Sequence, residues 1–309
     1  MSRSIYHLSA HEKFHLQSYE AKEKTLRDIV RGVAMRHYAA SYIAGRTGVG
    51  KTYIVEDEVG QSGRASTYRN ARVTPAGLFE LFDRHSDDVI ILDDVASLLK
   101  EKQAQQILQG ALDSRMARRV TRTIHGRDQS VLVTGGLIAI SNLPLDDDPI
   151  AASIQSRVVS YEFNPTNDEI AAFMKHLVLM KRKGLYGLVR EDCLCVVAFL
   201  VEEARQHAQW LDLRHLAKAC GFYKQWRKGH AKNHWQDLVR VSIQQPLKNG
   251  PLSKQEEIAR QRNLVRQMMS RYPGDVPRQI KESGLSKSTF YVRRREIEAE
   301  EQRKRRRGA

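Results

Sequence analysis

The sequence has few of the features that mark a secreted, metal-binding or membrane-embedded protein. Its 309 residues include three cysteines, an odd number, and the nearest pair has C-x-C spacing. This pattern predicts neither a disulfide framework nor a zinc site, so we interpret Cys193, Cys195 and Cys220 as reduced core thiols. The longest apolar run, residues 193–201, is far shorter than the roughly 20 residues that cross a bilayer. Because no secretory leader pattern opens the chain, we expect a cytoplasmic protein without a membrane segment.

Acidic residues are scarce only toward the C-terminus. Residues 221–309 hold 22 Lys and Arg against 9 Asp and Glu, whereas residues 1–220 hold 29 against 27. The net charge of +15 is therefore almost entirely C-terminal. Because Lys and Arg displace counterions condensed on phosphates, a basic region attached to a near-neutral one predicts a nucleic-acid-binding arm. A solubilising tail is the alternative.

The chain length predicts two or three domains, since a domain takes roughly 100–200 residues. A capping box at Ser9 and Glu12 predicts a lead-in helix over residues 9–35. Short apolar runs alternate with helical patterns after it, which predicts a doubly wound α/β domain. From residue 167 to about 223 the pattern is purely helical, and residues 224–251 are basic and irregular. The predicted strands are 39–44, 89–92, 137–140 and 161–163, and the helices are 51–59, one from 74 and 97–115.

These patterns divide the chain into four predicted parts. The boundaries are 1–38 for the helical lead-in, 39–165 for the α/β core, 166–250 for a helical lid with a basic extension, and 251–309 for a basic C-terminal region.

A phosphate-binding loop is the clearest motif in the sequence. The string GRTGVGKT follows an apolar strand and precedes a helix, which is the context that a P-loop requires. Its glycines let backbone N–H groups surround phosphate oxygens, while the lysine reaches the β- and γ-phosphates. A chance match in a glycine loop is the alternative. The predicted cofactor-binding residues are Gly45, Arg46, Thr47, Gly48, Val49, Gly50, Lys51 and Thr52.

Polar side chains that could complete the site follow two later strands. The run VIILDD places Asp93 and Asp94 at a strand end, where Asp93 and Thr52 would hold Mg²⁺ and Asp94 would act as general base. The alternative is that the pair caps the following helix. Asn142 ends the next buried strand, where its amide would position the attacking water, although an ordinary turn residue is the other interpretation.

Two arginines are candidates for transition-state contacts. Arg157 closes the α/β part and could reach the γ-phosphate held by a neighbouring subunit, as arginine fingers do, or make a local salt bridge. Arg214 lies at a helix start in the lid, from which it could close over the nucleotide.

In order along the chain, GRTGVGKT, VIILDD, AISN, SRV and LDLRHL resemble the motifs of an AAA+ ATPase over about residues 42–223. The resemblance implies a three-layer parallel-sheet core with an α-helical lid, ATP and Mg²⁺ as cofactors, and a ring or filament of subunits. One departure is Asp94, where many AAA+ enzymes carry Glu. The Asp-Asp pair is similar to the bacterial helicase-loader and transposition-ATPase branch, and other segments look like ATPases of phages and mobile elements.

Two regions could contact DNA. A β-hairpin over residues 118–134 carries Arg118, Arg119, Arg122 and Arg127 and could follow a phosphate backbone, or simply be a solvated hairpin.

The second region, residues 275 onward, resembles a helix-turn-helix with Ser286 as N-cap. Ile280, Leu285, Phe290 and Ile297 would face its core, and residues 303–307 would anchor phosphates. An amphipathic helix pair for subunit contact is the alternative. The residues predicted to face DNA are Lys287, Ser288, Thr289, Tyr291 and Arg293.

Three functions remain open on the sequence alone. The first is a DNA-stimulated ATPase that oligomerises with ATP and loads or remodels a replication or mobile-element complex, with a helicase, initiator or transposase as protein partner. The second is an ATP-dependent DNA filament that recruits a transposase. The third is a nucleotide-sensing helix-turn-helix regulator without significant turnover.

Overall fold

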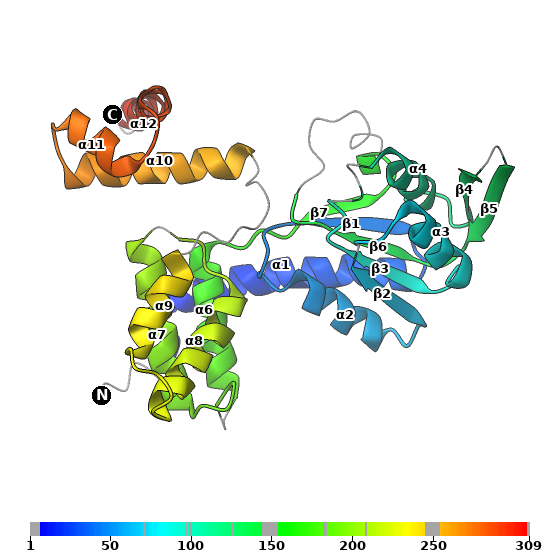
Figure 1. The fold of residues 1–309 in the computed structure, drawn as a ribbon, viewed down its shortest axis with the longest axis horizontal. Helices are drawn as coiled ribbons and strands as arrows, with labels where there is room; N and C mark the ends of the chain where they lie inside the picture. The colour runs from blue at the N-terminus through cyan, green and yellow to red at the C-terminus, as the bar shows by residue number, and fades with distance from the viewer. Residues whose placement is uncertain are drawn as a thin grey trace.

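A computed structural model describes residues 7–70, 72–96, 98, 101–124, 127–143, 154–181, 184–207, 209–244 and 254–307. Figure 1 shows an α/β core, a bundle of helices beside it and a C-terminal group of three helices. Within these described ranges, no helix is both long enough and apolar enough to span a membrane.

The core is built on a five-stranded parallel sheet. Its strand order is β2-β3-β6-β1-β7, so β1 lies between β6 and β7, and β2 forms one edge. Because all five strands run in the same direction, their C-terminal ends lie along one edge of the sheet. The strands are β1 (Ala40–Ala44), β2 (Ser66–Asn70), β3 (Val89–Asp93), β6 (Leu137–Ile140) and β7 (Val159–Glu162).

Helices cover both faces of the sheet, which gives the three layers that the sequence predicts. Alternate strand residues point to opposite faces, as the period of two requires. Ile43, Ile91 and Ile138 face one core together with α1 (Ala10–Ala34) and α2 (Lys51–Gln61). Tyr42, Ile90 and Ala139 face the other core with α3 (Pro75–Arg84) and α4 (Lys102–Ala111). The α/β fold class is therefore confirmed.

A two-stranded antiparallel hairpin projects beside α3, formed by β4 (Arg118–Ile124) and β5 (Arg127–Val133). Val120 and Val133 bury one of its faces against the α3 and α4 layer. The hairpin lies at the end of the molecule opposite the lid (Figure 1).

The lid is a bundle of four helices that follows the sheet directly. Its helices are α6 (Asn167–Met180), α7 (Arg190–Gln206), α8 (Leu213–Arg227) and α9 (Trp235–Gln244). Their apolar faces join the same continuous core as α1 and α2. The sheet and the lid therefore share one hydrophobic interior.

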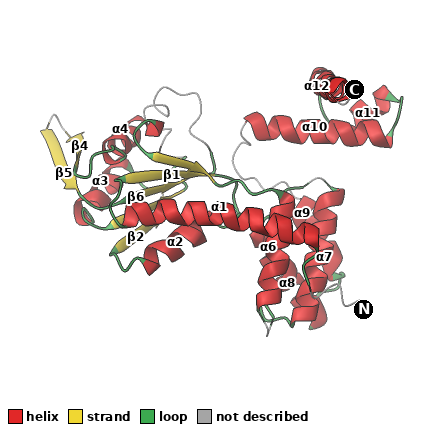
Figure 2. Ribbon diagram, turned by 180° about the vertical axis from the view of Figure 1, so that it is seen from behind, coloured by secondary structure: helices red, strands yellow, loops and turns green. Residues whose placement is uncertain are grey.

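Helix α1 belongs to both the core and the lid. Its N-terminal half contacts α6 through the Lys22–Glu169 ion pair at 2.7 Å, and its C-terminal half contacts α2 through Arg31 and Glu58 at 2.7 Å. Figure 2 shows α1 passing from the sheet to the lid bundle. The capping box predicted at Ser9 and Glu12 is present at the start of this helix.

The C-terminal group consists of α10 (Lys254–Arg271), α11 (Val276–Ser283) and α12 (Lys287–Arg307). Phe290 and Ile297 are fully buried against Val265 and Met268, with Ile280 and Leu285 packed around them. Gly284 ends α11 with φ +66°, and the Ser286 hydroxyl accepts a hydrogen bond from the Thr289 N–H, as an N-cap does. The helix, turn and helix predicted from the sequence are therefore present.

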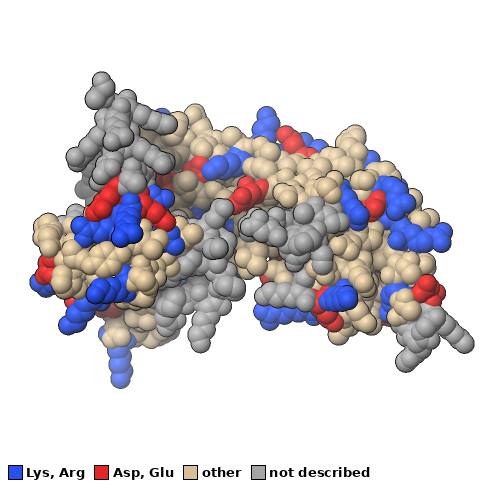
Figure 3. Space-filling model, turned by 90° about the horizontal axis from the view of Figure 1, so that it is seen from above, with Lys and Arg blue, Asp and Glu red and all other residues tan. Residues whose placement is uncertain are grey.

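Basic side chains lie on several parts of the surface, with acidic side chains among them. On the face seen from above, Lys and Arg lie over the C-terminal helices and over the end that carries β4 and β5 (Figure 3). Exposed basic side chains are therefore present on both of these parts.

Three elements differ from the sequence predictions. Strand β2 was not predicted, because an exposed edge strand with residues such as Arg69 carries no apolar signal. The helix predicted over residues 97–115 is shorter, since α4 ends at Ala111 and β4 begins at Arg118; residues 97, 99 and 100 lie outside the described part. The irregular segment predicted after residue 224 contains α9.

The cysteine interpretation holds in part. Cys193 and Cys220 are buried free thiols, whereas Cys195 is exposed on α7 and is not a core residue.

Candidate functional site

The P-loop connects β1 to α2 at the C-terminal edge of the sheet. Lys51 is buried at the start of α2, and its ammonium group donates to the backbone carbonyls of Gly45 and Arg46, the latter at 2.6 Å. Its charge is therefore held inside the loop, where the backbone N–H groups converge. The loop and the first turn of α2 have the geometry of an anion-binding site.

The two candidate metal ligands are in direct contact. The Thr52 hydroxyl donates to Asp93 Oδ2 over 2.8 Å, which joins the P-loop helix to the end of β3. Hydroxyl and carboxylate oxygens are the ligands that Mg²⁺ prefers, and Mg²⁺ is usually bound by one or two such groups together with phosphates. These side chains fit the ion that the sequence predicts.

Asp94 has an unusual backbone conformation. Its φ of +63° lies in the left-handed region, and Arg36, Asp94 and Tyr186 are the non-glycine residues among those described that share it. Asp tolerates this region better than most residues, but the conformation still costs about 1 kcal/mol or more. Because two of the three, Asp94 and Tyr186, line one cavity, local strain gathers at the candidate site.

Asn142 is in place beside these carboxylates. It follows β6, and its Oδ1 atom is buried without a hydrogen-bond partner in the described part of the chain. Buried polar atoms are nearly always hydrogen-bonded in proteins, so an unpartnered amide oxygen that lines a cavity indicates a ligand or water there.

A cavity of about 730 Å³ brings the predicted residues together. It lies between the C-terminal edge of the sheet, α2 and the lid. Of the predicted residues, it contains most of the P-loop and all of the polar strand-end side chains. Its lining residues are Thr47, Gly48, Gly50, Lys51, Thr52, Tyr53, Glu56, Asn70, Arg72, Asp93, Asp94, Ile140, Ser141, Asn142, Tyr186, Leu213, Arg214 and Ala217.

The lid contacts the P-loop at Gly48. The Leu213 N–H donates to Gly48 O over 2.9 Å, and a Cβ on Gly48 would lie 2.0 Å from Asp212 Cγ. Gly48 also has φ +74°, so both its conformation and its surroundings require glycine. Asp212 caps α8 by accepting from the Arg214 N–H, and Arg214 lines the cavity from the first turn of this helix.

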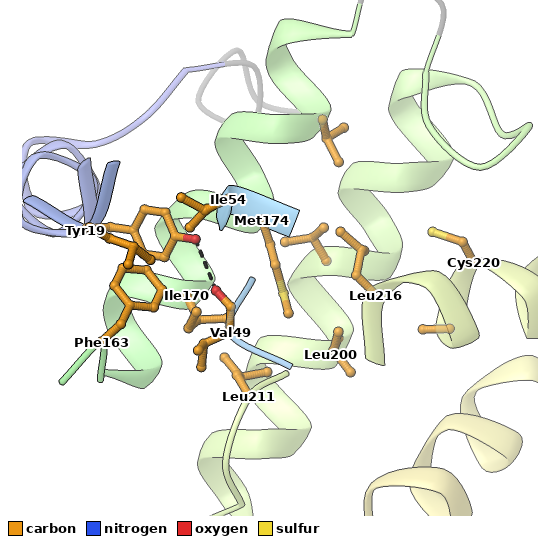
Figure 4. Packing of buried hydrophobic residues seen from close by; sticks show 14 of the residues in the cluster. Tyr19, Val49, Ile54, Phe163, Ile170, Met174, Leu200, Leu211, Leu216 and Cys220 are labelled. Carbon is orange, nitrogen blue, oxygen red and sulfur yellow. Dashed lines mark hydrogen bonds between the residues drawn. The ribbon is translucent and has the colours of Figure 1, made fainter. Parts of the chain in front are cut away.

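Helix α1 braces the P-loop from the other side. The Tyr19 hydroxyl donates to Val49 O over 3.2 Å, and the Tyr19 ring stacks on Phe173 of α6 with ring centres 4.2 Å apart. Figure 4 shows Tyr19, Phe163 and Ile170 gathered around Val49. The phosphate loop is therefore held between the lead-in helix and the lid.

Three of the predicted P-loop residues, Gly45, Arg46 and Val49, do not line the cavity. Val49 points into the core described above and is fully buried. The Arg46 guanidinium lies 4.1 Å from the centre of the Trp210 ring and donates to Pro165 O, so it joins the loop to the segment between β7 and α6 and to the segment that leads into α8.

Arg157 lies near the N-terminal end of β7, on the side of the sheet opposite the strand ends that carry the cavity. It lies two residues before β7, and it is exposed close to Asp113, whose pKa it helps to lower together with Arg115. A strand of the length of β7 spans about 13 Å, so Arg157 is well separated from the strand ends that carry the cavity. The structure therefore does not bring Arg157 to the site of its own chain.

Several lining residues could not be expected from the motifs. Asn70 and Arg72 come from the end of β2, Glu56 from the second turn of α2, and Tyr186 from a tight turn in the lid. Tyr68 of β2 donates to Asp93 Oδ2 over 3.0 Å. Burial and this bond to a carboxylate raise the pKa of Tyr68 to about 12.

The hairpin residues predicted to bind DNA have different roles. Arg118 is fully buried and donates to the carbonyls of Ala39 and Gly135, so the prediction that it contacts DNA is wrong. Period-two alternation places it on the inner face of β4 with Val120. Arg122 stacks on Phe79 at 4.3 Å and is half-buried, whereas Arg119 is exposed on the outer face.

The C-terminal candidates also require one correction. Arg293 is only 16% exposed and is held by Gln261 at 3.0 Å and Glu296 at 2.6 Å, so it packs within the helical group instead of facing outward. Lys287, Ser288 and Tyr291 are exposed as predicted, while Thr289 is half-buried and bonded to Ser286.

An exposed stripe runs along α12 on the side away from its core. Ser288, Tyr291, Val292 and Arg295 follow one another at positions i, i+3, i+4 and i+7, which places them on one helix face. Val292 is 49% exposed although it is apolar. We call these four residues the α12 stripe. The side chains of residues 303–307 lie outside the described part.

No protein-family model matches the chain, and no curated protein matches its sequence. Among solved structures, NtrX from Brucella abortus in complex with ADP is similar at 14% sequence identity and a TM-score of 0.43, over 87% of this chain and 66% of the NtrX chain. The chain thus spans slightly less than two thirds of NtrX. A Thermotoga maritima RuvB mutant is similar at 13% identity and a TM-score of 0.44, over 87% of this chain and 83% of that one.

The structure itself shows the strand order, the P-loop after β1 and the helical bundle after β7. The chain has a P-loop α/β core with a helical lid, the arrangement that the resemblance to AAA+ ATPases predicts.

Proposed function

We propose that this chain is a DNA-binding ATPase of the AAA+ type. It would oligomerise with ATP and load or remodel a nucleoprotein complex of a replication system or mobile element. The observation that carries the proposal is the single cavity that unites Lys51, Thr52, Asp93, Asp94 and Asn142. Protein partners of the kind expected are a helicase, an initiator or a transposase.

The side chains of the cavity have distinct tasks in this proposal. Backbone N–H groups of the P-loop and the Lys51 ammonium bind the phosphates of the nucleotide. Thr52 and Asp93 would hold Mg²⁺, which supplies charge neutralisation between the β- and γ-phosphates when bound. The Asp94 carboxylate accepts a proton from the attacking water, and the Asn142 amide orients that water.

The position of Arg157 supports a site shared between subunits. In its own chain it lies at the opposite edge of the sheet, so it could contact the γ-phosphate only in a neighbouring copy. An arginine supplied in trans is worth about 10³–10⁵ in turnover in P-loop enzymes. ATP would then join subunits, and hydrolysis would release them.

A mixing experiment tests the shared site. Lys51→Ala protein cannot bind the phosphates, and Arg157→Ala protein cannot supply the arginine, so each alone should hydrolyse little ATP. In a random one-to-one mixture, about one quarter of the interfaces combine an intact P-loop with an intact Arg157, and activity should return to that extent.

Arg115 provides the matched control, because it is exposed and shares Asp113 with Arg157. Arg115→Ala protein should keep wild-type turnover. Mixtures that stay inactive would contradict a shared site. Electron microscopy with DNA and a non-hydrolysable ATP analogue then distinguishes closed rings from the continuous filament of a transposition regulator.

DNA binding is assigned to the C-terminal helices on the basis of the α12 stripe. A helix that presents hydroxyl, aromatic, apolar and cationic groups along one face suits contact with base edges and phosphates in a groove. Lys287, next to the stripe at the helix start, adds a second exposed cation.

DNA affinity of single variants tests this surface. Arg295→Ala protein should lose affinity for duplex DNA and lower the slope of log K against log salt by about 1, as loss of one phosphate contact does. Arg293→Ala is the control, since that guanidinium is held by Gln261 and Glu296, and its salt slope should not change. Equal slopes for both variants and the wild type would refute the assignment.

A nucleotide-sensing regulator with little turnover is the second candidate. It is favoured by Asp94, whose side chain is one methylene shorter than Glu and whose backbone is left-handed. Phosphate release with and without DNA, compared between wild type and Asp94→Ala, distinguishes the two functions: equal rates that ignore DNA would favour the regulator.

A further inference from the structure

We propose that Tyr68 is a positioning residue for the metal-binding carboxylate of Asp93. The proposal rests on the proposed function, because it assumes that the cavity binds a magnesium nucleotide. The phenol of Tyr68 and the hydroxyl of Thr52 both donate to the same atom, Asp93 Oδ2, over 3.0 and 2.8 Å. Three elements, β2, β3 and α2, meet at that oxygen.

The sheet register explains why Tyr68 can reach Asp93. Tyr68 pairs with Ile91 across the parallel β2–β3 ladder, and Asn70 pairs with Asp93. Because side chains alternate along a strand, Ile91 and Asp93 point to the same face of β3. The long side chain of Tyr68 leans along the sheet over two residues, about 7 Å, and places its hydroxyl at the carboxylate.

Packing alone does not account for Tyr68. It lies on the edge strand, where its neighbours Ser66, Arg69 and Asn70 are exposed, and it is itself 38% exposed. An aromatic residue at such a position contributes little to the core. Its defined contact is the hydrogen bond to the carboxylate, which indicates a role at the site.

The bond determines which oxygen of Asp93 is available to a metal. Two donors occupy Oδ2, so the carboxylate is fixed in one orientation with Oδ1 turned away from them. A Thr52 hydroxyl that binds a metal through its oxygen can still donate its proton, so Tyr68 and Thr52 would together hold the carboxylate in this orientation. Outer partners of this kind typically account for about 10–100-fold in metal affinity or activity.

The test is the magnesium dependence of nucleotide binding, measured with a fluorescent ADP analogue and without turnover. Tyr68→Phe keeps the ring and removes the hydroxyl. In EDTA this variant should bind the analogue as the wild type does, because no metal is involved. With free Mg²⁺ varied, it should need about 10-fold more Mg²⁺ for half of the metal-dependent gain in affinity.

Tyr53→Phe is the matched control. Tyr53 also lines the cavity but lies on α2, is 71% exposed and makes no hydrogen bond to Asp93. Its loss of a hydroxyl should leave the magnesium dependence unchanged.

Two outcomes overturn the proposal. The first is a Tyr68→Phe protein with the wild-type magnesium dependence. The second is an equal loss of affinity with and without Mg²⁺, which would show a structural role only. Failure of the part of the proposed function that this inference uses, nucleotide binding in the cavity, looks different, because the wild type itself would then not bind the ADP analogue under any condition.

Discussion

The contact between Gly48 and Asp212 makes Gly48→Ala an informative substitution. An alanine there would adopt φ +74°, which costs about 1–2 kcal/mol for a residue with a side chain. Its Cβ would also lie 2.0 Å from Asp212 Cγ, so the carboxylate and the start of α8 must move. Overpacking of this kind costs about 1–3 kcal/mol, which gives a total of about 2–5 kcal/mol.

Gly63→Ala separates the cost of the backbone conformation from the cost of the collision. Gly63 has φ +68°, and nothing lies within 4 Å of a Cβ placed on it, so only the backbone cost of about 1–2 kcal/mol applies. The difference between the two variants in free energy of unfolding measures the cost of the collision with the lid.

Tryptophan fluorescence is a suitable assay, because all three tryptophans, Trp210, Trp226 and Trp235, belong to the lid or to the loop that leads into α8. Gly48→Ala should lower the free energy of lid unfolding by about 1–3 kcal/mol more than Gly63→Ala and should increase the exposure of Trp210 above its 39% in this structure. In the Gly48→Ala, Asp212→Ala double variant the collision disappears, so its cost should be less than the sum of the single costs. Equal effects of Gly48→Ala and Gly63→Ala would refute the inferred contact.

Three further predictions concern charge. Asp94→Asn keeps a residue that tolerates positive φ but removes the base, so turnover should fall by about 10²–10⁴ in a phosphate-release assay while the melting temperature stays unchanged. Burial raises the pKa of Glu169, but the hydrogen bonds from Lys22, Ser18 and the Thr166 N–H outweigh burial and lower this pKa. The ionised Glu169 carboxylate therefore stabilises the fold above the ordinary carboxyl pKa, and this stabilisation is lost as the pH falls below about 4. Acid titration followed by tryptophan fluorescence should show this loss of stability, and the loss should be smaller in the Glu169→Gln protein. Arg118→Met removes the side-chain donor to the Gly135 carbonyl and one of two donors to the Ala39 carbonyl, which also accepts from the Leu137 N–H. It should cost about 1–3 kcal/mol in urea unfolding without changing DNA affinity, whereas Arg119→Met should leave stability unchanged.

Local signals in the sequence predicted the elements whose causes are themselves local. The capping box at Ser9 and Glu12, the Thr74 cap and the continuous apolar strands β3 and β6 depend on neighbouring residues, and all are present. The P-loop and the strand-end carboxylates could likewise be placed at one edge of the sheet, because parallel strands align their C-terminal ends.

The errors arose where a side chain's environment depends on a distant segment. Tyr68 could not be assigned, because β2 is polar and its partner Asp93 is defined only by the sheet register. Arg118 and Arg293 were placed on the surface by their charge alone. Their spacing from Val120 and from Phe290 and Ile297 would have placed both on buried faces.

Helix α1 limits how the lid can move relative to the sheet. The two are joined by the chain between β7 and α6 and, separately, by α1, whose 25 residues extend over about 37 Å. A body attached at one point can turn about any axis, but a body attached at two points can turn only about the line that joins them. Any motion of this lid relative to the sheet is therefore restricted to a swing about that line.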